Sequence, residues 1–351
     1  MPRFRWDDLE ALGTEIFVRV GAPREEAAWV AALLTRASLG GHDSHGVLRI
    51  PEYVRECRAG RVRPAAVPAV EECGPATLRV DGRFGFGQVV ARRGMELAIA
   101  RARAHGVAAV ALRRLGHVGR LADYVELAAE AGLAGLMVAN DGGGNRIVAP
   151  AGGLEGRLST NPLAIGLPRR SPPHLVVDLA TSVVAAGTLA ACLAAGEPAP
   201  AGALQDAEGR PTTDPAAPYR DPPGTLLPMA GHKGYALAVA IEVLAGVLTG
   251  AGFARPDAAL ESQGVLVLAL DIGRFVPLDR FVADVEALVA YVKSARRRPG
   301  VAEIHVPGEP AWRRAQARRA AGVPVAEATW AEIVAVCREL GVTPPAPLPE
   351  G

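Results

Sequence analysis

The residues best suited to chemistry lie together at positions 40–49, which read GGHDSHGVLR. This stretch holds two imidazoles, a carboxylate, a hydroxyl and a guanidinium, and three glycines interrupt it. It has few apolar side chains to bury, so we expect a loop, and loops on a rigid scaffold carry many catalytic groups. Because histidine moves protons near neutral pH, this segment is the first candidate for acid–base chemistry.

Metal binding is the main alternative for this segment, because His42 and His45 have the H-x-x-H spacing of some metal sites. No third ligand follows at the spacing of a zinc site, and we therefore expect no metal. A serine hydrolase with a G-x-S-x-G nucleophile elbow is not expected either, since the sequence lacks that motif.

Two further polar clusters stand where predicted strands end. The turn 116–119, GHVG, follows one strand, and Asn140 and Asp141 with a run of glycines follow the next. Ligands of α/β sheets bind outside the carboxyl ends of strands, so both clusters are candidates for a ligand site. For His117 a purely structural role at a helix start stays open.

Short hydroxyl and amide residues also border two later strands, at 159–161 and 178–182. Such residues could bind the phosphates or ribose of a cofactor, or they could form turns and helix caps. Lysine is rare, and Lys233 is one of only two in the chain. It opens a predicted helix after His232, and an ammonium at a helix N-terminus favours an anion. The segment 306–310, VPGEP, could simply start another helix.

The elements that must position these residues alternate between strand and helix, which predicts an α/β sheet with parallel segments. Two helices, separated by a break at 21–23, are expected before these elements, and 61–74 is expected to be an extended linker. The region 196–228 is rich in turn residues and predicts a long excursion. We expect strands at 76–81, 107–112, 133–138, 163–167, 175–178, 264–270 and 304–306. We expect further helices at 51–60, 88–104, 121–131, 233–248, 279–294, 309–321 and 329–340. The last of these has the Thr329/Glu332 spacing of a capping box.

Composition limits the possible partners. The formal net charge of +1 gives no field that would attract nucleic acid or an anionic membrane, and 5% aromatics make a base-stacking platform improbable. The apolar run 235–253 carries Glu242 and glycines, which favours a buried helix over a membrane span. Four dispersed cysteines and an N-terminus without an apolar signal core predict a cytoplasmic protein with reduced thiols.

A Rossmann fingerprint is tempting at 85–87, GFG, because it lies between a strand and a helix. Val90 occupies the place of the third glycine, and the following strand ends in Leu112-Arg113-Arg114 rather than in an acidic residue. The sequence therefore predicts a plain tight turn.

As a set, the clusters resemble the type-2 malate/L-lactate dehydrogenase family, which lacks a Rossmann fold and also includes ureidoglycolate and sulfolactate dehydrogenases, diketogulonate reductase and cyclic-imine carboxylate reductases. The resemblance extends from His42 to Trp330 and rests on DSHG at 43–46, GHVG at 116–119, STNPLAIGLP at 159–168, DLATS at 178–182, RPTTDP at 210–215, GHKGYALA at 231–238 and VPGEP at 306–310.

This resemblance implies a non-Rossmann, mixed-sheet α/β fold of the sulfolactate dehydrogenase type, with the helical N- and C-terminal segments packed together. It divides the chain into 1–75 with 309–351, a mainly helical dimerisation and substrate segment, an α/β substrate-side unit at 76–160, and a cofactor-binding α/β unit at 161–308. It also implies a homodimer with active sites near the subunit interface, and hydride transfer between NAD or NADP and a small 2-hydroxy or 2-keto acid.

By the same resemblance, His45 is the proton donor and acceptor, with Ser44 beside it and His117 adjacent; His117 is the base in some relatives. Arg49 would hold the substrate carboxylate as a fork. The implied cofactor-binding residues are Asp141, Thr160, Asn161, Asp178, Leu179, Ala180, Thr181, Ser182, His232, Lys233, Gly308 and Glu309.

The sequence departs from the family pattern at two places. Ala185-Ala186-Gly187-Thr188 replaces a basic stretch that ends in Gly-Lys, and the region 249–264 is short, with Ser262-Gln263-Gly264 in place of Asn-Gly-His. Two alternatives therefore stay open beside the hydroxyacid dehydrogenase: a reductase of a cyclic imine carboxylate, and a catalytically weak relative that binds nucleotide or a partner.

Overall fold

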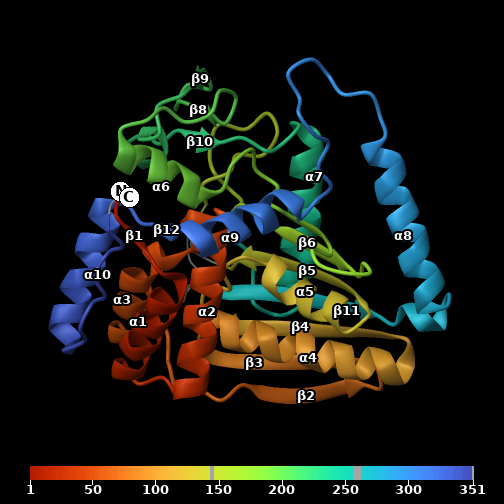
Figure 1. Ribbon diagram of the computed structural model, residues 1–351. Coiled ribbons are helices and arrows are strands. Elements are labelled where there is room, and N and C mark those ends of the chain that lie inside the picture. Colours follow the sequence, from red (N-terminus) through yellow and green to blue (C-terminus); the bar gives the residue numbers. More distant parts are fainter. Residues whose placement is uncertain (143–145, 256–261, 350–351) are drawn as a thin grey trace.

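A seven-stranded mixed sheet forms the centre of the protein (Figure 1). The computed structural model describes residues 1–142, 146–255 and 262–349. The strands lie in the order β2(Ala69–Gly74), β3(Thr77–Gly85), β4(Val107–Leu115), β11(Gln263–Leu270), β5(Ala134–Asp141), β6(Leu163–Leu167) and β7(Leu175–Leu179). Among these strands only β3 and β4 pair in parallel, so the expected parallel character holds for a single pair.

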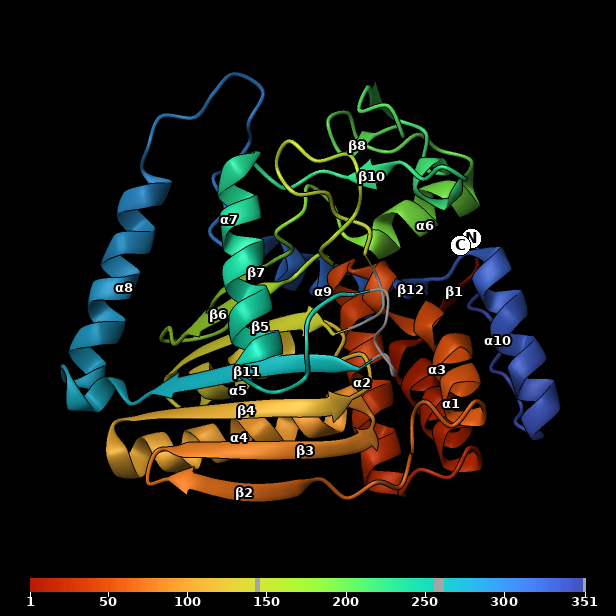
Figure 2. The same ribbon diagram turned by 180° about the vertical axis from the view of Figure 1, so that it is seen from behind.

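Helices cover both faces of this sheet (Figures 1 and 2). The helices α4(Gly87–His105) and α5(Ala122–Glu130) pack on one face, and α7(His232–Ile241) with the π-helical turn Glu242–Val247 packs on the other. Because it is covered on both sides, β11 buries consecutive apolar residues, whereas β3 and β4 bury alternate ones, such as Val80 and Val110. The main core lies between the sheet and α4 and α5.

The two ends of the chain share a second core beside the sheet. Helices α1(Trp6–Arg19), α2(Arg24–Gly40) and α3(Ile50–Arg58) pack with α9(Glu309–Ala321) and α10(Glu327–Leu340), and β1(Arg3–Phe4) pairs with β12(Val323–Pro324). Buried residues from both ends, among them Phe4, Phe17 and Ile333, form one apolar cluster. The expected packing of the terminal helical segments is thus present.

A third region carries the predicted excursion. Here α6(Ala186–Ala195) lies beside a small antiparallel sheet of β8(Leu204–Gln205), β9(Pro211–Thr212) and β10(Thr225–Leu226). Helix α8(Leu278–Lys293) stands at the edge of the molecule, and Val289 is its one buried residue (Figure 2). Among the described residues, no helix combines the length and the apolarity that crossing a membrane requires.

Several sequence-based expectations were wrong in detail. Residues 304–306 form no strand, and α10 begins at Glu327, which places Thr329 inside the helix and leaves it no capping role. The expected linker contains β2, an exposed edge strand without apolar alternation. The expected helix 233–248 changes from α to π at Glu242.

The turn at 85–87 is a tight turn, as predicted, and its glycine has a steric reason. A Cβ on Gly87 would come within 2.1 Å of the Gly116 carbonyl oxygen, so the start of α4 packs directly on the turn that carries His117. The mixed order of the sheet also differs from a Rossmann sheet.

Candidate active site

The glycine-rich segment forms the connection between α2 and α3. Helix α2 ends at Gly40, Gly41 follows with a φ of 79°, and two short 3₁₀ turns, Asp43–His45 and Val47–Arg49, lead into α3. Ser38 accepts a hydrogen bond from the Val47 amide at 3.0 Å, and its Oγ lies where a side chain on Gly46 would have to be. This loop is therefore held in one conformation and presents the polar side chains to the end of the sheet.

The two predicted histidines meet at this end. The rings of His45 and His117 lie 5.5 Å apart, centroid to centroid, at an angle of 25°. His45 Nδ1 is 2.9 Å from Ser44 Oγ, which leaves Nε2 of His45 as the ring nitrogen available to a ligand. Although His45 and His117 are 72 residues apart in the sequence, the fold makes them one site.

Two residues of this site were not predicted. The Tyr53 hydroxyl lies 2.7 Å from His117 Nδ1, and Gln88 donates from Nε2 to the same hydroxyl at 2.8 Å. Tyr53 follows Arg49, the residue just before α3, by four positions, so the two side chains lie on the same side of the helix start, and this spacing was the available signal. Nothing distinguishes Gln88 in the sequence from an ordinary residue at a helix start.

Desolvation sets the protonation of this group. Burial, with a contribution from the nearby Arg49 charge, lowers the pKa of His45 to about 3 and the pKa of His117 well below its ordinary value. Burial also raises the pKa of Tyr53. At neutral pH both imidazoles are therefore neutral and the phenol keeps its proton, so each histidine can accept a proton from a ligand or donate a hydrogen bond to it.

Arg49 is partly occupied by its own chain. Its Nε donates to the Ser44 carbonyl at 2.8 Å, and its Nη1 donates to Glu52 Oε2 at 2.5 Å. Its Nη2 lies 3.3 Å from the place where a Cβ on Gly187 would be. Arg49, Gly187, His45 and His117 line one cavity of about 260 Å³, so Nη2 is the part of the guanidinium left for an anionic ligand.

Two further cavities adjoin this one in succession. A second cavity of about 370 Å³ shares His45, Thr160 and Ala185 with the first. A third, of about 750 Å³, shares His42, Arg120, Asp178 and Leu179 with the second and reaches Gly308 on the far side of β7. Because they share walls, the three cavities form a row, here called the groove, that begins at the histidine pair, and we expect an elongated ligand to lie along it.

Half of the predicted cofactor-binding residues line this groove. Asp141 and Thr160 line the first cavity, and Thr160 also borders the second. The second cavity is lined by Asp178, Leu179 and Ala180, and the third by Asp178, Leu179 and Gly308. Asp178 accepts a hydrogen bond from the Ala122 amide at 2.9 Å, and burial raises the pKa of its carboxyl to about 6.

The other predicted residues have different surroundings. Thr181 and Ser182 are buried, and their hydroxyls donate to backbone carbonyls of Thr160 and Val184. His232 and Lys233 are exposed at the start of α7. The Met229 amide, just before this helix, donates a hydrogen bond to the Thr181 carbonyl. They do not line the three cavities, so their part in cofactor binding stays a prediction.

Asn161 belongs to a buried cluster around Glu242. The Glu242 carboxylate accepts hydrogen bonds from Asn161 Nδ2 at 2.6 Å, from Asn140 Nδ2 at 3.0 Å and from the Ala254 amide at 2.9 Å. Asn140 directly precedes Asp141, and Asn161 directly follows Thr160. The cluster thus fixes the two strand ends that carry the predicted ligand-binding residues of the first cavity.

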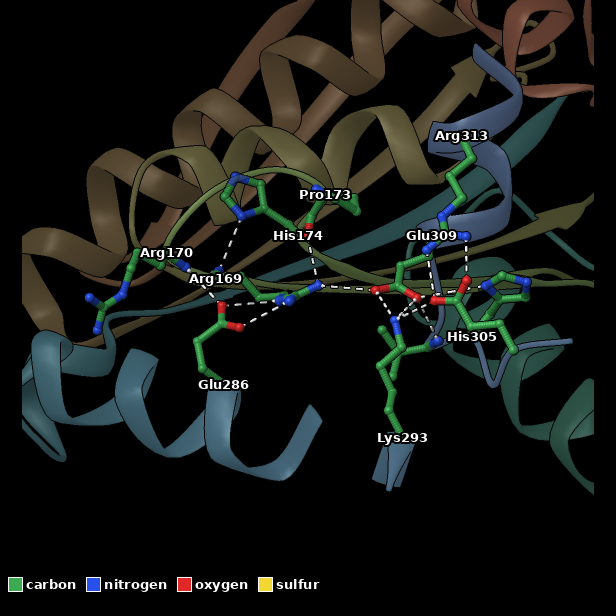
Figure 3. A network of polar contacts seen from close by, with 11 residues as sticks. Arg169, Arg170, Pro173, His174, Glu286, Lys293, His305, Glu309 and Arg313 are labelled. Atoms are coloured by element: carbon green, nitrogen blue, oxygen red, sulfur yellow. Dashed lines mark hydrogen bonds and ion pairs between the residues drawn. The ribbon is translucent and has the colours of Figure 1, made fainter. Parts of the chain in front are cut away.

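Glu309 belongs to a network of ion pairs at the edge of the groove (Figure 3). It accepts hydrogen bonds from Lys293 Nζ at 2.8 and 2.9 Å, and Arg169 joins it to Glu286 of α8. Glu303, His305 and Glu309 are close enough to hold a metal ion. However, Lys293 bonds to both glutamates and Arg313 bonds to Glu303, so cations of the chain already occupy this position.

The two departures from the family pattern both touch the first cavity. Ala185, Ala186 and Gly187 line it, and a Cβ on Gly187 would lie 2.6 Å from Ser44 Cβ, so only glycine allows this approach. Gln263 accepts a hydrogen bond from the Val118 amide at 2.9 Å and thereby holds the His117 turn. Residues 256–261 of the shortened region lie outside the described residues.

Sequence comparison identifies the family. A family model described as malate/L-lactate dehydrogenase matches residues 4–334. The chain belongs to the malate/L-lactate dehydrogenase family. It is 38% identical over 342 residues to an L-lactate dehydrogenase of Cupriavidus necator, and the alignment covers 95% of this chain and 97% of the relative. It is 35% identical over 338 residues to a Δ1-pyrroline-2-carboxylate reductase of Ancylobacter novellus, with 94% and 96% covered.

The fold agrees with that assignment. The sulfolactate dehydrogenase of Methanocaldococcus jannaschii superimposes with a TM-score of 0.86 at 32% identity, and 97% of this chain and 98% of that chain are covered. The non-Rossmann mixed α/β fold expected from the resemblance is therefore confirmed. As a member of this family the protein is a dehydrogenase that acts on CH–OH groups, and it requires a nicotinamide cofactor.

The groove suits a dinucleotide in its donor chemistry. Its first cavity combines neutral imidazoles with Arg49. Its third is lined by the guanidinium groups of Arg36, Arg314 and Arg319 and by the backbone around Gly308, beside the carboxylates of Glu126, Glu130 and Asp178. A flat, partly apolar ring at the histidines and charged phosphates farther along would both find suitable neighbours.

Proposed function

We propose that this protein transfers a hydride between NAD or NADP and C2 of a small 2-hydroxy or 2-keto acid of the malate or lactate type. The observation that carries this proposal is the pairing of His45 and His117 with Arg49 in one small cavity that opens into an elongated groove. The nicotinamide, when bound, supplies or takes the hydride, and the histidines mark its end of the groove.

The chain's own groups account for the remaining steps. In alcohol oxidation, neutral His45 accepts the hydroxyl proton at Nε2, because Nδ1 is tied to Ser44; in the reverse direction the same atom returns the proton. Arg49 orients the substrate carboxylate through Nη2, in the first cavity beside the histidines, and the volume of about 260 Å³ suits a small acid.

A second candidate function uses the same groups. The similarity to a Δ1-pyrroline-2-carboxylate reductase favours reduction of a cyclic imine carboxylate as the alternative. Such a reaction also needs a hydride, a proton and a cation for the carboxylate. The weak-relative alternative has less support, because Gln263 and Gly187 fit the site closely at the two departures.

We also propose that the protein is a homodimer, built through α7 and α8 rather than through the terminal helical segment that the resemblance implies. Five apolar residues of the α7 region are exposed, and α8 presents further ones: Val239, Val243, Leu244, Val247 and Leu248, with Leu288, Tyr291 and Val292. Exposed apolar surface of this extent is typical of an interface, and light scattering on the purified protein would give its mass. The cytoplasmic location stays a prediction.

A panel of 2-hydroxy, 2-keto and cyclic imino acids, followed by the absorbance of the reduced nicotinamide with both cofactors, tests the function. On the best substrate, His45→Ala should lower kcat by about 10²–10⁴-fold and leave cofactor affinity nearly unchanged. His117→Ala is the matched variant and should act more through KM. Loss of turnover in His117→Ala alone would assign the proton transfer to His117.

A further inference from the structure

A buried amide next to the histidine pair has no role in the steps described so far. Gln88 is 1% exposed, near the start of α4, and its Nε2 lies 2.8 Å from the Tyr53 hydroxyl, which lies 2.7 Å from His117 Nδ1. The three side chains come from α4, from α3 and from the turn after β4. They form a continuous hydrogen-bonded chain that ends on a ring in the first cavity.

The direction of this chain follows from what each atom can do. An amide nitrogen only donates, so the Tyr53 oxygen accepts from Gln88. The hydroxyl hydrogen of Tyr53 is then left for its other partner, His117 Nδ1, which must accept. A neutral imidazole that accepts at Nδ1 carries its hydrogen on Nε2.

We propose that Gln88 is a positioning residue that fixes His117 as the Nε2–H tautomer. In this form His117 donates a hydrogen bond to the substrate oxygen and does not take its proton, and proton transfer falls to His45. Two adjacent histidines thus receive different roles from their Nδ1 partners, Ser44 for His45 and Tyr53 for His117. The role of His117 toward the substrate rests on the proposed function, whereas the tautomer of His117 does not depend on it.

The oxygen of the Gln88 amide indicates that this residue is present for its N–H donor. Gln88 Oε1 is buried and has no hydrogen-bond partner among the described residues. An unpaired buried oxygen costs stability, and a methionine of similar length would avoid that cost. The amide is therefore explained by what its nitrogen does to Tyr53 rather than by packing.

The variant Gln88→Glu reverses the chain while keeping its shape. A carboxylate accepts from the Tyr53 hydroxyl, whose oxygen would then accept from Nδ1–H of His117 and leave Nε2 bare. Gln88→Met removes the donor without supplying an acceptor. Gln205→Met is the matched control, because Gln205 also has a buried amide that donates to Thr225, at a distant site in the small sheet.

The test is the ¹⁵N spectrum of the histidine ring nitrogens in the ligand-free protein, with the His117 signals identified from a His117→Ala sample. We expect a protonated Nε2 and a bare Nδ1 in the wild type, the opposite pattern in Gln88→Glu, and a wild-type pattern in Gln205→Met. If Gln88→Glu does not fold, Tyr53→Phe replaces it and should remove the preference for Nε2–H. On the best substrate, Gln88→Met should lower kcat about 10-fold with little change in cofactor affinity.

A wild-type His117 with its hydrogen on Nδ1, or an unchanged His117 pattern in both Gln88 variants, would overturn the inference. These spectra need no substrate, so a failure of the proposed function would appear separately, as an inactive wild-type protein with the expected tautomer.

Discussion

Glu242 gives the sharpest test of how the site is held together. Its carboxylate is buried and accepts three hydrogen bonds, from Asn140, Asn161 and the Ala254 amide. Glu242→Ala would remove the acceptor of one buried N–H in each of these groups, although Asn140 Nδ2 would keep its bond to the Gly252 carbonyl and Asn161 Nδ2 its bond to the Ala238 carbonyl. At about 1–3 kcal/mol for each buried unpaired group, partly relieved by relaxation, we expect a loss of about 3–5 kcal/mol in the free energy of unfolding.

Glu242→Gln is the graded comparison for this prediction. It keeps one oxygen, which can still accept from Asn140 and Ala254, but its amide nitrogen would face Asn161 Nδ2, donor against donor. Asn161 Oδ1 has no hydrogen-bond partner in the part of the chain that the structure describes, so rotation of the Asn161 amide would restore one bond and give up the bond to the Ala238 carbonyl. We therefore expect a smaller loss, about 1–3 kcal/mol, from weaker neutral bonds.

The assay is urea denaturation of both variants, with cofactor binding measured in parallel. Since the cluster fixes Asp141 and Thr160, both variants should also bind NAD(P)H more weakly. A Glu242→Ala protein destabilised by less than about 1 kcal/mol would refute the reasoning, because three buried donors cannot lose their acceptor so cheaply.

Three further predictions concern the groove. Arg49→Lys should raise KM for carboxylate substrates far more than it weakens cofactor binding, because a single ammonium cannot keep the bonds to Ser44 and Glu52 and also reach the carboxylate at the place of Nη2; a wild-type KM would place the carboxylate elsewhere. Lys233→Ala should weaken NAD(P)H binding by about 1.5–3 kcal/mol if the cofactor reaches the start of α7, and an unchanged affinity in a fluorescence titration would remove Lys233 from the site. Because the pKa of His45 is lowered to about 3, the base is neutral well below pH 6.5. The kcat/KM for alcohol oxidation should therefore stay level as the pH falls through 6.5, and an acid limb at that pH would contradict the assignment.

The sequence was most informative where polar residues interrupt apolar patterns. His45 and His117 stand in glycine-rich turns that a core could not use, and the fold does bring them together. Glu242 likewise stood out in an apolar run. The signal for Tyr53 was only its four-residue spacing from Arg49, and Gln88 had none, because it is a single polar residue at a helix start. Only the fold shows that Tyr53 contacts His117 and that Gln88 contacts Tyr53.

Other predictions concern local patterns that have two possible uses, and the role of these residues in cofactor binding stays a prediction. Thr181 and Ser182 lie at a strand end, where a hydroxyl can bind a ligand or the backbone, and here both bind backbone carbonyls. Glu309 lies beside a groove residue, yet its partner Lys293 comes from another helix, which no local spacing reveals. The strand β2 was missed because an exposed edge strand need not alternate, and the π-helical turn was missed because a period of 3.6 residues does not distinguish it.

Direct transfer of deuterium tests the central claim most closely. The wild-type protein is supplied with reduced nicotinamide that carries deuterium at both C4 positions, in the NADH and the NADPH forms, together with the 2-keto and cyclic imino acids of the panel. The account predicts a reduced product that carries one deuterium at C2. This product should form only when the cofactor groove is intact. A reduced product without deuterium, or no reduction of any such acid by a folded protein that binds the cofactor, would contradict it.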